Sequence, residues 1–191
     1  MAGPLIAGVD EAGRGCLAGP VVAAAVILPS ALSHPLLKDS KMLTPYAREE
    51  VFHFLLSHSV AMGVGIQGPE AIDRQNVLRA TLLAMKEAVE SLPLIPHLVR
   101  IDGPHAPPLP FQTETHIGGD KTYPEIAAAS IVAKVLRDRL MEKLHKDFPC
   151  YDWKQNKGYP TPAHKKALIE YGPSILHRLS FLQKILQRSY C

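Results

Sequence analysis

The chain has 191 residues, of which 47% are hydrophobic and 20% are charged. These values are typical of one globular domain with a small extension, and they exclude a long disordered or low-complexity protein. The uncharged run at residues 16–28 is shorter than the ~20 residues of a membrane span and follows acidic residues, which argues against a membrane segment and a secretory signal. Three widely separated cysteines without a CxxC pair indicate neither a disulfide framework nor a zinc site, so we expect a reducing, cytoplasmic setting.

The charge is unevenly distributed, although the formal net charge is only +3. Residues 134–191 contain 12 Lys and Arg against 5 Asp and Glu, whereas residues 1–133 contain 9 against 13. A basic back half beside an acidic front half suits a protein that binds polyanions next to cations. Helices with solvent-exposed basic faces would explain this charge distribution equally well.

Short runs rich in Val and Ile predict five strands, at residues 5–9, 21–28, 60–66, 98–101 and, more weakly, 113–117. Helices are predicted at residues 45–57, 77–92, 124–145, 162–171 and 174–188. Thr44 and Asn76 are the expected N-caps of the first two. The last helix has one apolar face, made of Ile175, Leu179, Leu182, Ile185 and Leu186.

This order of elements predicts an α/β fold with a mixed five-stranded sheet flanked by helices. We place the main domain at residues 1–147 and a basic helical C-terminal extension, packed on it, at residues 148–191. No internal repeat interrupts this organisation.

Two adjacent carboxylates, Asp10 and Glu11, follow the first apolar run in the sequence GVDEAGRG. Side chains alternate between the two faces of a strand, so we expect the strand to end at these acids. Gly13 and Gly15 then allow the chain to turn and to bring Glu11 to the side of Asp10.

A third carboxylate, Asp102, follows the fourth predicted strand. If the first and fourth strands are parallel neighbours about 4.8 Å apart, Asp10 and Asp102 emerge side by side at their carboxyl ends. Carboxylates so close raise one another's pKa and suit a hard cation such as Mg²⁺ or Mn²⁺. Taken singly, an Asp at a strand end is more often a turn or cap residue.

One further acid can join this group, either Asp120 or Asp138. The two are separated by up to ~27 Å along a continuous helix. Gly118-Gly119 and the start of a helix favour Asp120, whereas Asp138, flanked by arginines, is typical of a salt-bridge network.

A dinucleotide-binding loop is disfavoured, because Gly13, Gly15 and Gly19 have the spacing GxGxxxG and are followed by Pro20 rather than by a helix. Walker A, HExxH, EF-hand and GxSxG patterns do not occur in the sequence.

Six motifs in order resemble those of the ribonuclease HII (type 2 ribonuclease H) family. They are GVDEAGRG at 8–15, LKDSKMLT at 37–44, IDG at 101–103, GGDKTYPEIAAASIVAKVLRDRLM at 118–141, NKGYPTPAH at 156–164 and RLSF at 178–181. Together they extend over nearly the whole chain, which makes an accidental match implausible.

The resemblance implies a ribonuclease H-like fold and an endonuclease that cuts the RNA strand of RNA-DNA hybrids. It also implies incision of duplex DNA 5′ to a single embedded ribonucleotide, leaving 3′-hydroxyl and 5′-phosphate ends. The family's metal-binding acids correspond to Asp10, Glu11, Asp102 and Asp120. Two ions, Mg²⁺ or Mn²⁺, are expected during catalysis.

The resemblance also assigns substrate contacts. The backbone of Gly13, Arg14 and Gly15 is expected to recognise the 2′-hydroxyl, and Tyr159 to stack on the sugar at the RNA-DNA junction. Phosphate contacts are expected for three further residues, Lys41, Arg178 and Ser180. The chain departs from common family residues at Cys16, Gly119, Asn156 and Leu179, which puts phosphate binding and substrate preference in doubt.

Two other functions are compatible with parts of the sequence. A non-catalytic hybrid-binding module would keep the basic extension but gains nothing from acids beside phosphates. A phosphatase of small phosphoesters would keep the acids, but the basic C-terminal third would be superfluous. We expect a monomer that acts without a membrane, and the sequence does not identify a replication protein that recruits it.

Overall fold

The computed structural model describes residues 3–30, 32, 37 and 43–187. The strands are β1 (Ile6–Ala12), β2 (Val21–Ile27), β3 (Ala61–Gln67), β4 (Leu98–Asp102) and β5 (Gln112–His116). The α-helices are α1 (Pro45–His58), α2 (Pro69–Gln75), α3 (Val77–Glu90), α4 (Pro124–His145), α5 (Trp153–Asn156), α6 (Pro162–Tyr171) and α7 (Leu179–Gln187). Two short 3₁₀ helices are η2 (Gly119–Lys121) and η3 (Pro149–Tyr151).

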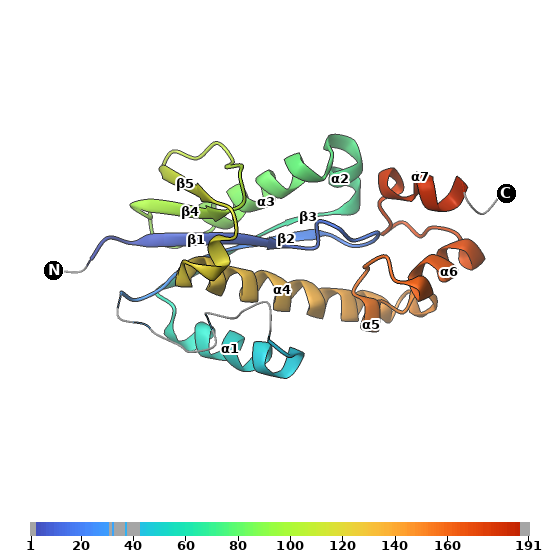
Figure 1. Cartoon of the computed structure of the whole chain (residues 1–191), viewed down its shortest axis with the longest axis horizontal. Helices are drawn as coiled ribbons and strands as arrows, with labels where there is room; N and C mark the ends of the chain where they lie inside the picture. Colours follow the sequence, from blue (N-terminus) through green and yellow to red (C-terminus); the bar gives the residue numbers. More distant parts are fainter. Residues whose placement is uncertain (1–2, 31, 33–36, 38–42, 188–191) are drawn as a thin grey trace.

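The five strands form one mixed sheet in the order β3-β2-β1-β4-β5, which confirms the predicted fold class. β1 pairs with β2 antiparallel and with β4 parallel, and β5 is parallel to β4. Both faces of the sheet are covered, with α4 and α1 on one side and α2 and α3 on the other (Figure 1). Helices α5 to α7 lie together at one end of the molecule. No helix among the described residues is long and apolar enough to cross a membrane.

A close helix-to-sheet contact aligns α4 with the central strand β1. A Cβ added at Gly8 would lie 2.1 Å from the backbone carbonyl carbon of Glu125, so only glycine permits this approach. Gly8, Asp10 and Ala12 share the face of β1 that α4 covers, because side chains alternate along a strand. Asp10 is therefore held beneath α4, where its carboxyl group interacts with Ser130.

Local signals place several helix starts where the sequence predicts them. The Thr44 hydroxyl accepts a hydrogen bond from the Ala47 N–H (3.2 Å), and the Asn76 side chain accepts one from the Arg79 N–H (3.1 Å). Both N-cap predictions are confirmed.

One predicted helix boundary is wrong, and one helix was not predicted. The last helix begins at Leu179 rather than at residue 174, because His177 forms a β-bridge with Ala18 and Ile175 is 87% exposed. The sequence analysis also missed α2, a seven-residue helix. The domain boundary at residue 147 stays a prediction.

Candidate active site

Parallel pairing of β1 with β4 brings two of the predicted acids together. The pairing ends at Val9 opposite Ile101, so Asp10 and Asp102 are the next residues on the two neighbouring strands. This confirms the expected adjacency of the strand ends. The expectation that β1 ends at the acids is wrong, because β2 continues to pair with β1 as far as Ala12. Glu11 lies beyond the end of the β1–β4 pairing, and its carboxylate interacts with those of Asp10 and Asp102 there.

The environment of these acids opposes negative charge. Burial, followed by the charges of Glu11 and Asp102, raises the pKa of Asp10 well above its ordinary value. Burial also raises the pKa of Glu11, and the Arg14 guanidinium, 3.2 Å from Glu11 Oε1, partly offsets this effect. Three carboxyl groups are thus close enough to affect one another's ionisation.

The fourth predicted acid, Asp120, is 2% exposed and lies in η2, immediately before α4. The Gly119 N–H donates a hydrogen bond to Asp102 Oδ1 (2.7 Å), which joins η2 to the end of β4. A Cβ at position 119 would lie 3.0 Å from the His116 Cβ and 2.7 Å from Ile126 Cδ1, so this departure from the family allows the close approach. Asp138 instead pairs with Lys134 one helical turn away (2.7 Å), as the sequence predicts.

The donor set has the chemistry that a hard divalent cation prefers, because all four side chains offer carboxylate oxygens and two have a raised pKa that a cation would lower. Within the described ranges, no group of three or more acidic, His or Cys side chains is arranged, as it stands, to hold a metal ion. Asp10 Oδ1 accepts the Glu11 N–H (2.7 Å), and Glu11 and Asp102 have the contacts given above. The chemistry of these residues therefore fits a hard cation, and the side chains would have to leave their present contacts to bind one.

The Gly13-Arg14-Gly15 turn follows β1 directly and has a special backbone. Gly13 has φ +96°, in the region that favours glycine. A Cβ there would also lie 1.9 Å from the Nε of Arg137, which is fully buried. Nothing lies within 4 Å of a Cβ at Gly15, which faces open space. The turn is thus packed on one side and open on the other.

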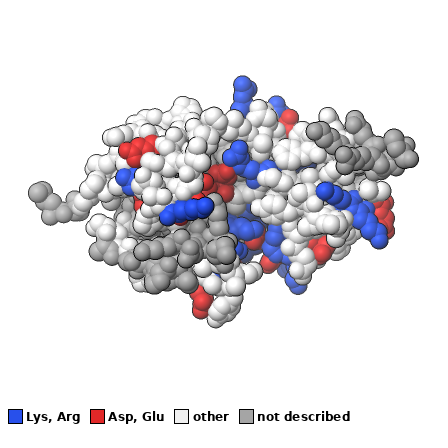
Figure 2. Space-filling model, in the orientation of Figure 1, with Lys and Arg blue, Asp and Glu red and all other residues white. Residues whose placement is uncertain are grey.

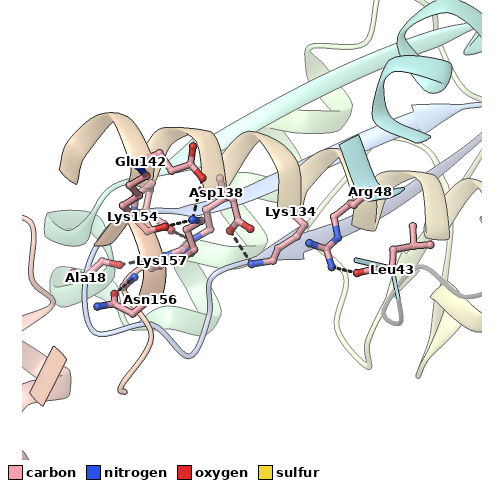
Figure 3. Close-up of polar contacts among 12 residues, drawn as sticks. Ala18, Leu43, Arg48, Lys134, Asp138, Glu142, Lys154, Asn156 and Lys157 are labelled. Atoms are coloured by element: carbon pink, nitrogen blue, oxygen red, sulfur yellow. Dashed lines mark hydrogen bonds and ion pairs between the residues drawn. The ribbon is translucent and has the colours of Figure 1, made fainter. Parts of the chain in front are cut away.

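The open side belongs to a cavity of about 370 Å³. It is lined by Glu11, Ala12, Gly13, Arg14, Gly15, Arg48, Ser130, Ile131, Lys134 and Tyr159. Tyr159 is 38% exposed, and the Lys134 Nζ lies 5.4 Å from the centre of its ring. Lys134 extends from α4, with Arg48 nearby on α1 (Figure 3). The predicted sugar-stacking residue and the predicted 2′-hydroxyl turn therefore line one cavity.

The predicted phosphate contacts are placed differently. Arg178 is fully buried and donates hydrogen bonds to backbone carbonyls, so its guanidinium is not placed for the phosphate contact that the resemblance implies. The Ser180 hydroxyl donates to Asp73, whose carboxylate also accepts the backbone N–H groups of Leu179 and Ser180. Ser180 thus lies in the first turn of α7, where Asp73 binds it. Lys41 lies outside the described residues.

Basic residues surround the acidic centre of the face shown in Figure 2. Lys and Arg side chains gather around the middle of this face and toward the C-terminal helices, next to a small acidic patch. Positive charge on this face would attract a phosphate backbone.

Sequence reasoning missed a buried histidine pair behind Tyr159. His177 Nδ1 accepts the Ser174 N–H (2.9 Å), which leaves its Nε2–H to donate to His164 Nε2 (3.1 Å). The Trp153 Nε1–H donates to the same His164 nitrogen (3.1 Å). His164 Nδ1–H then donates to the Tyr159 carbonyl (2.9 Å). The hydrogen bonds are satisfied only when both imidazoles are neutral, and no spacing in the sequence signals this pair.

Acid is expected to destabilise the protein through His177. Burial, and then the charge of His164, lowers the pKa of His177 to about 4, against about 6.5 when unfolded. A folded pKa below the unfolded pKa gives stability that is complete above pH ~6.5 and is lost as the pH falls toward 4. Between pH 7.5 and pH 4, the melting temperature of the wild type should fall more steeply than that of His177→Gln. Equal slopes would contradict this assignment.

Comparisons with known proteins agree with one another. The model of the family described as Ribonuclease HII matches residues 7–184. Curated relatives named Ribonuclease HII include those of Porphyromonas gingivalis, 52% identical over 91% of this chain and 87% of its own, and Granulibacter bethesdensis, 50% identical over 94% and 84%.

Solved structures give the same picture. The ribonuclease H2 of Pyrococcus horikoshii has a TM-score of 0.77 at 28% identity, covering 97% of this chain and 98% of that chain. The ribonuclease HII of Archaeoglobus fulgidus, solved as a complex with PCNA, has a TM-score of 0.74 at 27% identity, covering 92% and 94%. A Bst RNase HIII solved with Mn²⁺ shares the fold, with a TM-score of 0.74 at 18% identity over 100% of this chain and 70% of that chain.

Proposed function

Because the chain belongs to the ribonuclease HII family, whose members are nucleases of RNA-DNA hybrids, we propose that it also incises duplex DNA 5′ to single embedded ribonucleotides. The reaction would be phosphodiester hydrolysis that leaves a 3′-hydroxyl and a 5′-phosphate. The observation that carries the proposal is the placement of Asp10 and Asp102 at the ends of neighbouring parallel strands, beside a cavity lined by the Gly13-Arg14-Gly15 turn.

We assign the binding of two divalent ions, Mg²⁺ or Mn²⁺, to Asp10, Glu11, Asp102 and Asp120. When bound, the ions would lower the pKa of the attacking water and stabilise the charge of the leaving 3′-oxygen. The raised pKa of Asp10 and of Glu11 supports this assignment, because positive charge is what the site lacks. The protein then supplies no nucleophile of its own.

The cavity supports the substrate contacts that the family resemblance implies, because the same residues line it. The backbone of Gly13, Arg14 and Gly15 would contact the 2′-hydroxyl, and Tyr159 would pack against the sugar at the RNA-DNA junction. Lys41 stays a proposed phosphate contact, and Lys134 and Arg48 are further basic residues at the same cavity.

We propose a monomer as the active form. PCNA accompanies the archaeal relative, so recruitment of this chain by a replication protein is a further proposal, which a pull-down would test.

One assay separates the candidate functions. The protein is incubated with a DNA duplex that contains one ribonucleotide, with Mg²⁺, with Mn²⁺ and with EDTA. Metal-dependent incision on the 5′ side of the ribonucleotide, with no cut in an all-DNA duplex, supports the proposal. Binding without incision would favour a hybrid-binding module, and hydrolysis of small phosphoesters alone would favour a phosphatase.

Replacing Tyr159 by Ala is expected to lower kcat/KM for the single-ribonucleotide duplex by about 5- to 100-fold, the range of a lost aromatic stacking contact. Tyr159→Phe keeps the ring and should retain most of the activity. Because the side chain is 38% exposed, neither change should prevent folding, which circular dichroism would check. Equal activity of the Ala variant and the wild type would contradict the assigned contact.

A further inference from the structure

The fully buried side chain of Arg178 binds the turn that carries the predicted 2′-hydroxyl contact. Its Nη2 donates to the Gly13 carbonyl (2.7 Å) and its Nη1 to the Arg14 carbonyl (2.9 Å). Nε and Nη2 both donate to the Gly19 carbonyl (3.0 and 2.9 Å). The guanidinium therefore closes the turn from residue 13 to residue 19 on its inner side.

These hydrogen bonds also fix the direction of two N–H groups. The described peptides contain no cis bond, and in a trans peptide the carbonyl of one residue and the N–H of the next point in opposite directions. With the Gly13 and Arg14 carbonyls turned toward Arg178, the N–H groups of Arg14 and Gly15 point away from it. That is the side on which these residues line the cavity and on which Gly15 has open space.

Arg178 is itself held firmly in place. Its N–H donates to the Leu17 carbonyl (2.8 Å), the preceding His177 bridges to Ala18, and Asp73 binds the N–H groups of the two residues that follow. Burial lowers the pKa of Arg178 to about 10, which leaves the guanidinium charged at neutral pH.

A second buried arginine, Arg137, binds carbonyls near the end of this turn and in the segment before Tyr159, and not those of Gly13 and Arg14. It donates to the carbonyls of Pro20 (2.9 Å), Ala18 (3.2 Å) and Lys157 (2.9 Å). Among the described side chains, Arg178 therefore binds both peptide units whose N–H groups face the cavity, and the Cys16 N–H also donates to the Gly13 carbonyl (3.4 Å).

We propose that Arg178 is a positioning residue for sugar discrimination: by binding the Gly13 and Arg14 carbonyls, it aims the Arg14 and Gly15 N–H groups at the ribose 2′-hydroxyl. This inference rests on the proposed function. A prealigned N–H donor does not have to reorganise when the sugar binds. Its hydrogen bond to the 2′-hydroxyl therefore contributes fully to the difference in binding free energy between ribose and deoxyribose. A lysine cannot replace the planar fork that reaches three carbonyls at once.

The test measures the ratio of affinities for a duplex with one ribonucleotide and for the matched all-DNA duplex, in EDTA so that no cleavage occurs. Arg178→Lys should bind the ribonucleotide duplex about tenfold more weakly, while its affinity for the all-DNA duplex stays within about twofold. Met141→Ala is the matched control. Met141 is fully buried in the adjacent core and packs on Gly19, but it binds no turn carbonyl, so its loss should lower the melting temperature and leave the ratio unchanged.

A folded Arg178→Lys protein that keeps the wild-type ratio would overturn the inference, as would an equal loss of ratio in Met141→Ala. If Arg178→Lys does not fold, the inference is tested on the wild-type protein by NMR. Its Arg14 and Gly15 amide resonances should shift when the ribonucleotide duplex is added and not when the all-DNA duplex is added, and unchanged resonances would overturn the inference. Incision by the wild type is measured separately, so failure of the proposed function is distinguished from failure of this inference.

Discussion

Asp10→Asn is expected to abolish cleavage, with kcat falling at least about 100-fold. Even the outer-shell partners of metal ligands are worth 10- to 100-fold, and Asp10 is assigned as a direct ligand. The carboxamide keeps the shape of the side chain and its acceptor oxygen for the Glu11 N–H. Binding of the duplex should therefore be largely retained, as a filter-binding or fluorescence titration would show.

The same substitution should stabilise the metal-free protein. Because the pKa of Asp10 is raised in the folded state, the carboxylate costs stability once the pH rises above its unfolded pKa of about 3.9. In EDTA at pH 7.5, Asp10→Asn should melt higher than the wild type, by about 2–4 °C for each kcal/mol regained. Saturating Mn²⁺ should raise the melting temperature of the wild type more than that of the variant. A variant that melts lower in EDTA and still cleaves would contradict both assignments.

Alanine at the two glycines of the turn should have opposite consequences. Gly13→Ala forces a side chain into φ +96° and against Arg137, which three carbonyls hold in place, so we expect a loss of about 2–5 kcal/mol in the free energy of unfolding. Gly15→Ala adds a methyl group in open space and should change stability by no more than about 0.5–1 kcal/mol.

Although Gly15→Ala should hardly change stability, it should strongly lower the activity. Its new methyl group would stand between the backbone and the sugar, and displacement of a substrate by about 1 Å can cost about 100-fold in rate. Urea unfolding and kcat/KM, measured on both variants, check the pair. A Gly15→Ala protein of normal stability and full activity would show that the sugar does not approach this backbone.

The adjacency of Asp10 and Asp102 could be predicted from the sequence because its signal is local. Asp10 and Asp102 each follow a short apolar run, and strand direction then brings the two together. The same reasoning preferred Asp120 to Asp138, and Asp138 pairs with Lys134 on its own helix. The roles of Asp10, Glu11, Asp102 and Asp120 as metal ligands stay predictions.

The errors concern features that depend on contacts distant in sequence. The resemblance assigns Arg178 to phosphates, because a sequence motif does not distinguish a buried arginine from a surface one. In the structure Arg178 binds the carbonyls of Arg14 and Gly13, which are 164 and 165 residues away in the sequence. The strand β1 extends through Glu11 because β2 pairs with it, which the alternation of its own side chains cannot reveal. The start of α7 likewise depends on Asp73 and on the bridge between His177 and Ala18.

The most direct test of the metal site is anomalous scattering from crystals of the protein grown with Mn²⁺ and a hybrid that cannot be cleaved. We predict manganese peaks within coordination distance of the carboxylates of Asp10, Glu11, Asp102 and Asp120, beside the 5′ side of a ribonucleotide. Manganese bound elsewhere, at a concentration that supports cleavage, with these four side chains still in their present contacts, would contradict the account.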